Sequence, residues 1–311
     1  MISVIIPSLN EERAIAETVQ LIREVLTKAQ IVPAEIIVVD DGSTDATAER
    51  AAAAGAKVIH HPMNAGYGRA LKAGIARATY DTIVITDADG TYPIHTIPEL
   101  FDRYTKGFDM VVGARSGVNY RGSLLKMPLR WMLRRLVEFT ASRSVPDINS
   151  GLRLFSKSTV TGYFDNLCDT FSFTTSLTLA YMMTGRFVTY VSIPYAERIG
   201  ESKVRLFRDS VRTFQYILEA AVFYDPLRIF LLFAAILVAC SALSFLAAAI
   251  LHLNVFFYLG VGGIIDASLV LSIGLLAVLL RQILAQSAKG QSAVEISASH
   301  DADFAQRQNL R

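Results

Sequence analysis

One stretch of this chain is almost free of charged residues, and it limits the possible folds more than any other feature. Between Ile229 and Leu280 there are 52 residues, and Asp266 is the only one with a formal charge. This region divides into two apolar segments, residues 227–251 and 255–280. Each is longer than the ~20 residues that a helix needs to cross the hydrocarbon core of a membrane. The sequence therefore predicts a transmembrane hairpin of two helices. The alternative is a pair of buried core helices, which rarely carry so few charges.

Positive charges flank the predicted hairpin on one side only. Arg228 stands at its start, and Arg281 and Lys289 follow its end, whereas the connector 252–254 contains no Lys or Arg. By the positive-inside rule, both ends are expected in the cytoplasm. We therefore expect residues 1–200 to form a cytosolic domain, attached to the cytoplasmic membrane (or to the endoplasmic reticulum in a eukaryote) at its C-terminal side. The N-terminus lacks the basic and apolar regions of a signal peptide.

Asp266 lies near the middle of the second apolar segment. An ionisable residue at that depth is a functional candidate by default. The favoured alternative is a packing residue at a helix or subunit contact, because nothing else polar in the hairpin suggests a proton relay. The hairpin also offers a surface for association into a homo-oligomer.

The chain as a whole is more apolar than an ordinary soluble protein. Apolar residues make up 52% of it and charged residues 19%, compared with about 25% charged residues in a typical soluble domain. This composition excludes a disordered chain and argues against a purely soluble one. Two cysteines, Cys168 and Cys240, are too few for a disulfide scaffold or a CxxC zinc site. The last residues, 286–311, are polar, rich in small residues and without periodicity, and we expect them to be disordered.

The first 115 residues alternate between strand-like and helix-like segments. Short runs rich in β-branched residues predict strands over residues 2–7, 35–40, 57–60, 82–87 and 110–114. Helical patterns lie between them, over residues 11–29, 45–54, 68–78 and 96–105. This alternation predicts an α/β fold with a Rossmann-like, mostly parallel sheet that is covered by helices on both faces.

Polar and acidic residues follow three of the predicted strands, at residues 8–11, 40–45 and 87–93. Ligands bind at the carboxyl ends of the strands in such sheets. Helix capping could explain a single such segment, through Asn10 or Thr44, but it does not explain three acidic ends at one edge. A phosphate-binding GxxxxGK[ST] motif does not occur, and Leu71 replaces the third glycine of a GxGxxG pattern. These absences disfavour a P-loop nucleoside triphosphatase and a dinucleotide-binding dehydrogenase.

Asp87 and Asp89 carry the sharpest chemical signal. They are two residues apart at a predicted strand end, where extended geometry would point both side chains the same way. Two converging carboxylates repel each other unless a cation joins them, and their hard oxygens suit Mg²⁺ or Mn²⁺ bound together with substrate phosphates. The same triplet at residues 301–303 follows no strand, and we interpret it as solvated and inert.

These motifs, taken in order, resemble those of family 2 glycosyltransferases with the GT-A fold. The resemblance is carried by VIIPSLNEE, VVDDGSTD, the N-x-G-x-G-x-A-x-x-x-G pattern of residues 64–74 and the strand ending in DAD. Two later blocks, DINSGLR at 147–153 and GESK at 200–203, narrow it together with the hairpin to polyprenyl-phosphate glycosyltransferases. That group includes dolichol-phosphate mannose synthases and bacterial undecaprenyl-phosphate glucosyltransferases, and the resemblance covers residues 1 to about 285.

The resemblance implies a reaction and a donor site. One sugar would pass, with inversion, from a nucleotide sugar of the UDP-glucose or GDP-mannose type to a polyprenyl phosphate such as undecaprenyl or dolichyl phosphate. The residues that would hold the donor nucleotide are Pro7, Leu9, Glu11, Asp41, Asp87, Ala88 and Asp89. Asp41 would face the base, Asp87 and Asp89 would bind the metal, and Arg115 matches a phosphate-contacting arginine. Thr91 stands where mannose synthases often carry glutamine, so its part in metal binding is open.

The acceptor site would need cations next to the membrane. Residues 119–143 contain six Lys or Arg residues, one acid and interleaved leucines and Trp131, which is typical of a helix at an anionic membrane surface. The alternative is a solvated basic face. Residues 203–225 have a related pattern and predict a second interfacial helix. The acceptor or diphosphate contacts that we expect are Arg115, Arg130, Arg198, Ser202 and Lys203.

Because a lipid phosphate is already anionic, the proposed reaction needs no obligatory general base. The resemblance, together with the need for a metal and cations at the diphosphate, implies Asp89, Arg115 and Lys203 as the catalytic residues. Two other functions remain open. A processive polysaccharide synthase of the same superfamily typically has more membrane spans and a Q-x-x-R-W motif, and neither is seen in this sequence. The second is a non-catalytic partner subunit, and the intact DAD and SK blocks argue against this interpretation. No nucleic-acid partner is expected.

Overall fold

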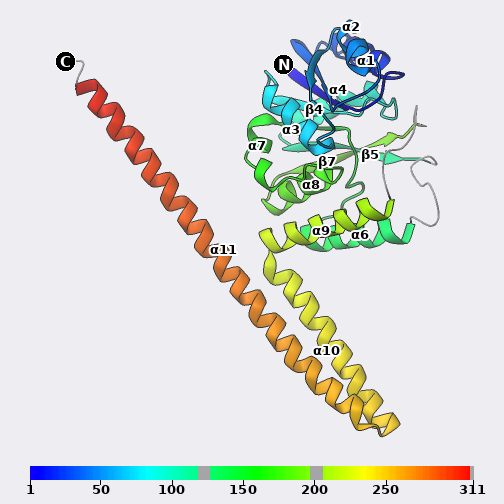
Figure 1. The fold of residues 1–311 in the computed structure, drawn as a ribbon, viewed down its shortest axis with the longest axis vertical. Coiled ribbons are helices and arrows are strands. Elements are labelled where there is room, and N and C mark those ends of the chain that lie inside the picture. The colour runs from blue at the N-terminus through cyan, green and yellow to red at the C-terminus, as the bar shows by residue number, and fades with distance from the viewer. Residues whose placement is uncertain (118–126, 197–205, 309–311) are drawn as a thin grey trace. The chain divides into compact units, whose positions relative to one another are not determined.

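The computed structural model describes residues 1–117, 127–196 and 206–308 (Figure 1). The chain divides into two compact units, Met1–Ala220 and Ala221–Arg311. The first unit contains the sheet and the second contains the two apolar helices.

The first unit is built on one sheet of seven strands. They are β1 (Ile2–Ser8), β2 (Ala34–Asp40), β3 (Lys57–His60), β4 (Thr82–Ile85), β5 (Met110–Ser116), β6 (Arg153–Ser156) and β7 (Val188–Pro194). Their order in space is β3-β2-β1-β4-β6-β5-β7. The predicted strands are confirmed, and the neighbouring pairs among them are parallel. The strands that sequence reasoning missed are β6, which runs antiparallel to both β4 and β5, and β7, which pairs parallel with β5.

Helices cover both faces of this sheet (Figure 1). One layer contains α1 (Ile15–Lys28), α2 (Thr47–Ala53), the short 3-10 helix η1 (Ile94–Thr96) and α4 (Ile97–Thr105). The other contains α3 (Tyr67–Arg77), α7 (Lys157–Thr161) and α8 (Phe173–Met183). The 3-10 helix η3 (Phe164–Asn166) lies between α7 and α8 in the sequence. β1 is buried at every position, as expected for a strand covered on both faces. The buried residues of α1 recur every three or four positions, which places one apolar stripe against the sheet.

The first predicted helix begins later than the sequence pattern suggested. The expectation was residues 11–29, but α1 starts at Ile15. The backbone N–H groups of Glu11 and Glu12 donate to the side chains of Thr47 and Asp45, 2.8 and 3.3 Å away. These contacts hold Glu11 and Glu12 against residues that follow β2, outside α1.

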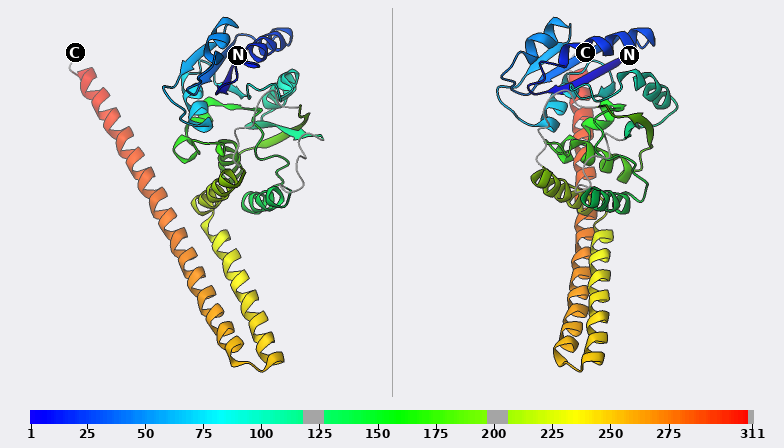
Figure 2. Two further views of the ribbon diagram at one scale, coloured as in Figure 1. Left: turned by 45° about the vertical axis from the view of Figure 1, so that its right-hand side comes forward. Right: turned by 90° about the vertical axis from the view of Figure 1, so that its right-hand side faces the viewer.

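Two longer helices, α6 (Met127–Ala141) and most of α9 (Leu206–Tyr224), lie in the first unit outside the layers that cover the sheet. α6 and α9 lie side by side (Figure 2). Val137 of α6 and Ile217 of α9 are buried in one apolar cluster with Leu179 of α8. α6 falls within the predicted basic segment 119–143, and α9 falls within the predicted interfacial segment 203–225.

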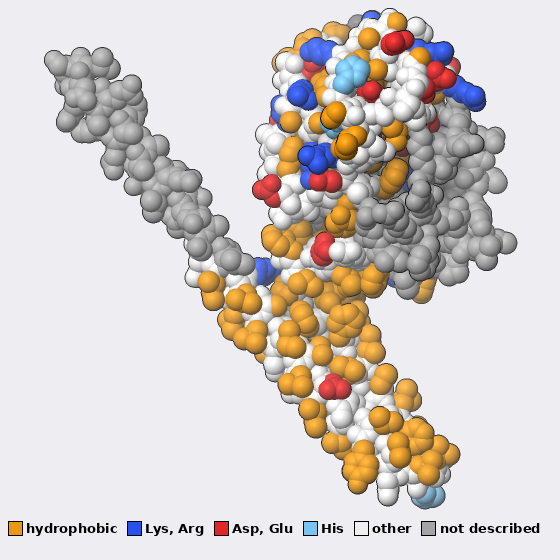
Figure 3. All heavy atoms as spheres, in the orientation of Figure 1, with side chains coloured by type: hydrophobic (Ala, Val, Ile, Leu, Met, Phe, Trp, Pro, Cys, Tyr) orange, Lys and Arg blue, Asp and Glu red, His pale blue; other side chains and the backbone are white. Residues whose placement is uncertain are grey.

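The second unit is a hairpin of α10 (Pro226–Leu251) and α11 (Asn254–Gln308). Its parts Pro226–Leu251 and Asn254–Ile283 are long and apolar enough to cross a membrane. Only 11% of the most apolar window of each is buried, which contradicts the alternative of two core helices. Hydrophobic side chains cover most of the described surface of the hairpin (Figure 3). The two helices pack through glycines, since a Cβ at Gly263 would lie 2.2 Å from Ser241 Oγ.

The expectation of disorder for residues 286–311 differs from the structure, in which α11 continues as a helix to Gln308. The physical reason is that forming the first turn of a helix is the unfavourable step, and the apolar part of α11 has already formed it. Adding further residues to its end costs much less free energy. Ala and Gln are common in this segment, and both have high helix propensity. A polar sequence without an apolar stripe can therefore extend a helix that the apolar part has formed.

Candidate active site

The carboxyl ends of β1, β2 and β4 meet at one edge of the sheet. The chain moves outward from β1 to β2 and β3, and then returns to the other side of β1 at β4. The loops after β1 and β4 therefore diverge, which is where ligands bind in open α/β sheets. β6 runs in the opposite direction, so residues 147–152, which precede it, come to the same edge.

The loops after β1 and β2 are joined by hydrogen bonds. Asn10 Oδ1 accepts from the backbone N–H of Thr44 at 2.8 Å, and the N–H of Asn10 donates to Ser43 Oγ at 2.9 Å. Asn10 adopts a φ of 51°, in the left-handed region that asparagine tolerates. It therefore links two loops and does not cap α1, whose N-cap is Ala14. Pro7 lies within β1, and Leu9 and Glu11 follow it at this joined edge.

Asp41, which follows β2, forms hydrogen bonds with the loop after β3. Its carboxylate accepts from the backbone N–H groups of Ala65 at 3.0 Å and Gly66 at 2.8 Å, and it lies 2.7 Å from His61 Nδ1. Only 4% of Asp41 is exposed. The role that sequence reasoning missed is therefore structural support of the glycine-rich segment. Contact with a nucleoside base stays a prediction for this residue.

The glycine-rich segment permits a close approach between two parts of the chain. Gly66 has a φ of 109°, a conformation that side chains disfavour. A Cβ at Gly68 would lie only 2.2 Å from the carbonyl oxygen of Cys168. Because these glycines let α3 begin directly against the loop 168–171, Tyr67 reaches the site edge and stacks on Phe171 with ring centroids 5.7 Å apart.

The two aspartates of the DAD triplet lie beyond the strand. β4 ends at Ile85, so Asp87 and Asp89 are not part of the strand as expected, and strand alternation does not set the direction of their side chains. The chain turns after Asp89 because the side chain accepts from the backbone N–H and the hydroxyl of Thr91, at 3.1 and 2.6 Å. Asp89 and Thr91 are both buried, whereas Asp87 is half-buried. Thr91 therefore orients Asp89 through hydrogen bonds.

Asp87 is held by residues from two other elements. Tyr67 Oη donates to its Oδ1 at 3.0 Å. Burial and the nearby Asp87 carboxylate raise the pKa of Tyr67, so its hydroxyl stays protonated and remains a donor. Gly151 packs against the same carboxylate, since a Cβ there would lie 2.9 Å from both oxygens. Sequence reasoning placed Gly151 in a motif but did not connect it with Asp87.

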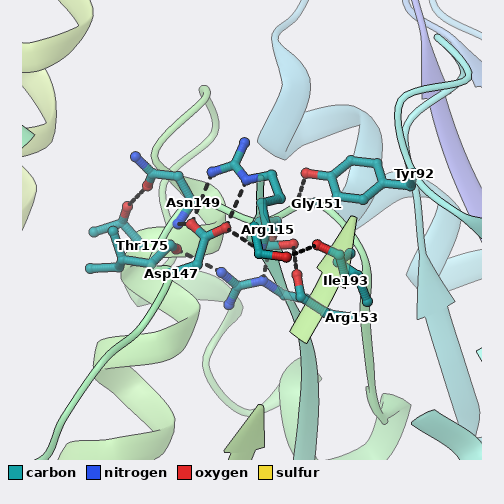
Figure 4. Close-up of polar contacts among 12 residues, drawn as sticks. Tyr92, Arg115, Asp147, Asn149, Gly151, Arg153, Thr175 and Ile193 are labelled. Atoms are coloured by element: carbon teal, nitrogen blue, oxygen red, sulfur yellow. Dashed lines mark hydrogen bonds and ion pairs between the residues drawn. The ribbon is translucent and has the colours of Figure 1, made fainter. Parts of the chain in front are cut away.

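A buried ion pair joins β5 to the segment before β6 (Figure 4). Arg115 Nε and Nη2 donate to the two carboxylate oxygens of Asp147, at 2.7 and 2.9 Å. Burial would raise the pKa of Asp147, but the hydrogen bonds and charge of Arg115 lower it below its ordinary value. The guanidinium also lies 5.3 Å from the ring centroid of Tyr195. The predicted phosphate-contacting arginine is thus held in one orientation.

Other residues of the DINSGLR block form buried hydrogen bonds that hold the segment before β6 in place. Arg153 is fully buried, and its guanidinium donates to the carbonyl oxygens of Ile148 and Ser150 and to Thr178 Oγ1. The N–H of Gly151 donates to Tyr92 Oη at 2.6 Å, as Figure 4 shows. Burial raises the pKa of Tyr92, so this hydroxyl stays neutral. The block therefore works as a scaffold for the site edge.

The DAD loop provides oxygen donors that fit a hard divalent cation. Asp87 and Asp89 are two carboxylates at the strand-end edge, and Mg²⁺ or Mn²⁺ typically takes one or two such groups and completes its shell with water and substrate phosphates. Among the residues that the structure describes, no three or more His, Cys, Asp or Glu side chains cluster as a metal site. The fit is therefore to a metal shared with a phosphate ligand, and not to an all-protein cage.

Four of the predicted acceptor residues cannot be placed at this edge. Arg198, Ser202 and Lys203 lie outside the described residues. Arg130 belongs to the helical backbone of α6, but its side chain is outside the described part.

The described part of α6 has one buried and one basic, aromatic face. Val137 and Ala141 pack inward, whereas Trp131 is 63% exposed. The Arg135 guanidinium lies 5.7 Å from the ring centroid of Trp131. The exposed side borders a groove lined by Trp131, Arg134, Arg135, Glu138, Ser142, Arg143 and Ser144. This pattern is typical of a helix at a membrane surface.

Known structures resemble the first unit in fold. Glucosyl-3-phosphoglycerate synthase from Mycobacterium tuberculosis, in complex with phosphoglyceric acid, has a TM-score of 0.59 and 24% sequence identity, and the match covers 71% of this chain and 80% of that one. The same enzyme in complex with Mn²⁺, uridine-diphosphate-glucose and phosphoglyceric acid has a TM-score of 0.58, with 24% identity over 71% of this chain and 79% of that one. This likeness places the domain in the GT-A fold class.

Related sequences agree with this fold. An undecaprenyl-phosphate 4-deoxy-4-formamido-L-arabinose transferase of Klebsiella pneumoniae (strain 342) is 28% identical over 245 residues, which cover 76% of this chain and 72% of that protein. A dolichyl-phosphate hexose transferase of Haloferax volcanii (strain DS2) is 29% identical over 211 residues, covering 65% of this chain and 86% of that protein. The sequence profile of glycosyl transferase family 2 matches residues 3–164, more than half of the chain. With its GT-A sheet and acidic strand-end site, this chain belongs to glycosyl transferase family 2.

Proposed function

We propose that this protein is a membrane-bound, inverting glycosyltransferase that moves one sugar from a nucleotide sugar to a polyprenyl phosphate. One observation carries the proposal: a family 2 domain with an acidic strand-end site precedes two exposed apolar helices in the same chain. The related transferases from Klebsiella and Haloferax, whose names contain undecaprenyl phosphate and dolichyl phosphate, support a lipid phosphate as the acceptor.

The donor would bind at the edge formed by β1, β2 and β4. Pro7, Leu9, Glu11 and Asp41 are the proposed nucleoside contacts. Asp87 and Asp89 would hold Mg²⁺ or Mn²⁺, which neutralises charge on the leaving diphosphate when it is bound. The structural relatives that contain Mn²⁺ or Mg²⁺ support this choice of cation.

Within this chain, the DAD loop and its supports would position the diphosphate. Thr91 fixes the direction of the Asp89 carboxylate, and Ala88 is held to α1 because its carbonyl oxygen accepts from Thr18 Oγ1 at 3.1 Å. Arg115 is the proposed phosphate contact, and its pairing with Asp147 keeps its orientation constant as charge develops on the leaving group.

The acceptor phosphate is proposed to meet a second set of cations, Arg130, Arg198 and Lys203, with Ser202 beside them. Being anionic near neutral pH, the lipid phosphate can attack the anomeric carbon without losing a proton to a base. Two described histidines near the site are already engaged, since His60 and His61 lie within 3.3 and 2.7 Å of the carboxylates of Asp40 and Asp41. Neither of these two histidines is therefore assigned a proton-transfer role.

The membrane arrangement follows from the charges and apolar surfaces. The hairpin is proposed to span the membrane with both ends in the cytoplasm, and α6 and α9 to lie at the interface. The exposed Trp131 beside Arg134 and Arg135 supports an interfacial position for α6.

The test is a transfer assay with the full-length protein in detergent or nanodiscs. We expect Mg²⁺ or Mn²⁺, polyprenyl phosphate and one member of a panel of nucleotide sugars to yield a lipid carrying a single sugar. The Asp89→Ala variant should transfer sugar at least ~100-fold more slowly than the wild type. Removing one group that stabilises developing charge typically lowers the rate by about that factor. A growing polymer would instead identify a processive synthase, and no transfer with any donor would favour a partner subunit.

A further inference from the structure

Asn149 presents an amide group at the surface, beside the ion pair of Arg115 and Asp147 (Figure 4). Its backbone N–H donates to Asp147 Oδ1 at 3.1 Å, and its side-chain Oδ1 accepts from Thr175 Oγ1 at 2.5 Å. Thr175 is fully buried as the third residue of α8, whereas Asn149 is exposed. Both the backbone and the carbonyl end of the side chain are therefore held by groups from other parts of the fold.

The other end of this amide, Nδ2, carries two N–H donors. Within the part of the chain that the structure describes, Nδ2 has no hydrogen-bond partner. Because Thr175 fixes the carbonyl end of a planar group, Nδ2 points away from Thr175 in one direction (Figure 4). A donor that is already ordered loses little conformational entropy when it binds a ligand. Asn149 is therefore suited to contact a molecule that carries oxygen acceptors.

The position of Asn149 indicates which molecule this is. The preceding residue, Ile148, packs against the apolar cluster that contains Val137 of α6 and Ile217 of α9, the helices proposed to lie at the membrane interface. Two residues after Asn149, a Cβ on Gly151 would lie 2.9 Å from both carboxylate oxygens of Asp87, a proposed metal ligand. The segment 148–151 therefore connects the interfacial helices with the donor site, and Asn149 is an exposed side chain between the two.

We propose that the Nδ2 group of Asn149 binds the phosphate of the lipid acceptor and holds it facing the donor sugar, an inference that rests on the proposed function. In that reaction a phosphate oxygen forms a bond to the anomeric carbon while the bond from this carbon to the diphosphate oxygen breaks. The electron pair of the broken bond leaves with the diphosphate, and no proton moves. A neutral amide can hold a phosphate oxygen without cancelling the negative charge that makes it a nucleophile.

A charge substitution tests this contact. Asn149→Asp keeps an oxygen that accepts from Thr175, but it replaces both N–H donors with a negative charge. Its KM for polyprenyl phosphate should rise about tenfold or more, because a hydrogen bond to a charged group is lost, while its KM for the nucleotide sugar stays unchanged. A rise in the KM for the nucleotide sugar instead would assign the amide to the donor and overturn the proposal.

Asn166→Asp is the matched control, because it makes the same change at an exposed residue of η3. Both of its KM values should equal those of the wild type. Thr175→Val tests the orienting contact, since it removes the hydroxyl at nearly constant volume. It should raise the KM for polyprenyl phosphate by a smaller factor than Asn149→Asp, and Thr175→Ser should restore the wild-type value. An unchanged KM in Thr175→Val would contradict the fixed orientation on which the proposal depends.

Direct binding separates this inference from the proposed function. The probe is farnesyl phosphate, a short isoprenyl phosphate, titrated into the full-length protein in mild detergent by calorimetry. The wild type should bind it, and Asn149→Asp should bind it about tenfold more weakly. If the wild type transfers sugar and Asn149→Asp has the same KM and affinity for lipid phosphate, the proposed function stands and the role of Asn149 is wrong. A wild type that neither transfers sugar nor binds farnesyl phosphate would overturn the proposed function and this inference with it.

Discussion

At the scale of single residues, Thr91 determines how Asp89 presents its carboxylate. Its hydroxyl donates to Asp89 Oδ1 at 2.6 Å from a fully buried position. If Asp89 binds the metal, removing this hydroxyl loosens a ligand that is otherwise fixed. We expect Thr91→Val to raise the Mg²⁺ or Mn²⁺ concentration for half-maximal transfer about tenfold, as is typical for residues that orient metal ligands.

The control for this prediction is Thr91→Ser, which keeps the hydroxyl and should restore the wild-type metal response. The measurement is a titration of transfer rate against metal concentration. An equal loss of rate at every metal concentration, with an unchanged midpoint, would mean that Thr91 supports the fold and not the metal site.

The ion pair between Asp147 and Arg115 is expected to contribute to the free energy of unfolding. Its pKa is lowered in the folded protein, so the stabilisation is complete above its ordinary value of 3.8 and is lost as the pH falls through the lower folded value. Asp147→Asn leaves the Arg115 charge buried without its partner, and it should lower the free energy of unfolding by about 3–5 kcal/mol at pH 7.

This prediction is checked by thermal unfolding of the full-length protein in detergent between pH 7 and 3. The difference in apparent melting temperature between wild type and Asp147→Asn should narrow as the pH falls below 4. Asp102→Asn is the control, because its pair with Lys106 is exposed and should contribute at most about 1 kcal/mol. A difference that does not vary with pH would contradict the role assigned to the Arg115 pair.

At the scale of elements, the start of α3 depends on a glycine at its second residue. Gly68 lies so close to the carbonyl oxygen of Cys168 that no Cβ fits there. Gly68→Ala must therefore move α3 or the loop 168–171, and overpacking of this kind typically costs about 1–3 kcal/mol. Because Tyr67 holds Asp87 from this helix, we expect a lower melting temperature and a reduced transfer rate.

Gly162→Ala is the matched control, since the nearest atom to a Cβ there is Thr159 O at 3.5 Å and its backbone φ is an ordinary −65°. It should change neither stability nor transfer appreciably. Wild-type stability in Gly68→Ala would contradict the idea that this close approach positions α3.

At the scale of the whole molecule, the proposed topology places the hairpin connector across the membrane from the catalytic domain. In intact bacterial cells that express a Cys240→Ser background, a membrane-impermeant maleimide should label His252→Cys from outside. Met63→Cys, which is 72% exposed in the first unit, should react only after the cells are opened. The reverse pattern would contradict the cytoplasmic orientation that the flanking arginines indicate.

Local patterns in the sequence predicted much of this architecture. The apolar runs predicted five parallel strands and both membrane-length helices, because hydrophobic periodicity and segment length are local properties. The motif resemblance also led to family 2, which the profile match confirms. The strand ends with Asp41, Asp87 and Asp89 were also identified from local sequence. Polar residues that directly follow an apolar run can be recognised without knowing the fold.

The tertiary structure alone decided which distant residues support these positions. β6 enters between β4 and β5 in the antiparallel direction, so Gly151 and Asp147 arrive beside Asp87 and Arg115 from more than thirty residues away in sequence. Tyr67 reaches Asp87 because Gly68, which has no Cβ, lets the start of α3 lie directly against the backbone of Cys168. The sequence was sufficient to predict β1 to β5, the hairpin and the acidic edge, because each follows from neighbouring side chains. Burial and strand pairing decided the rest, because they depend on which segments meet only after the chain has folded.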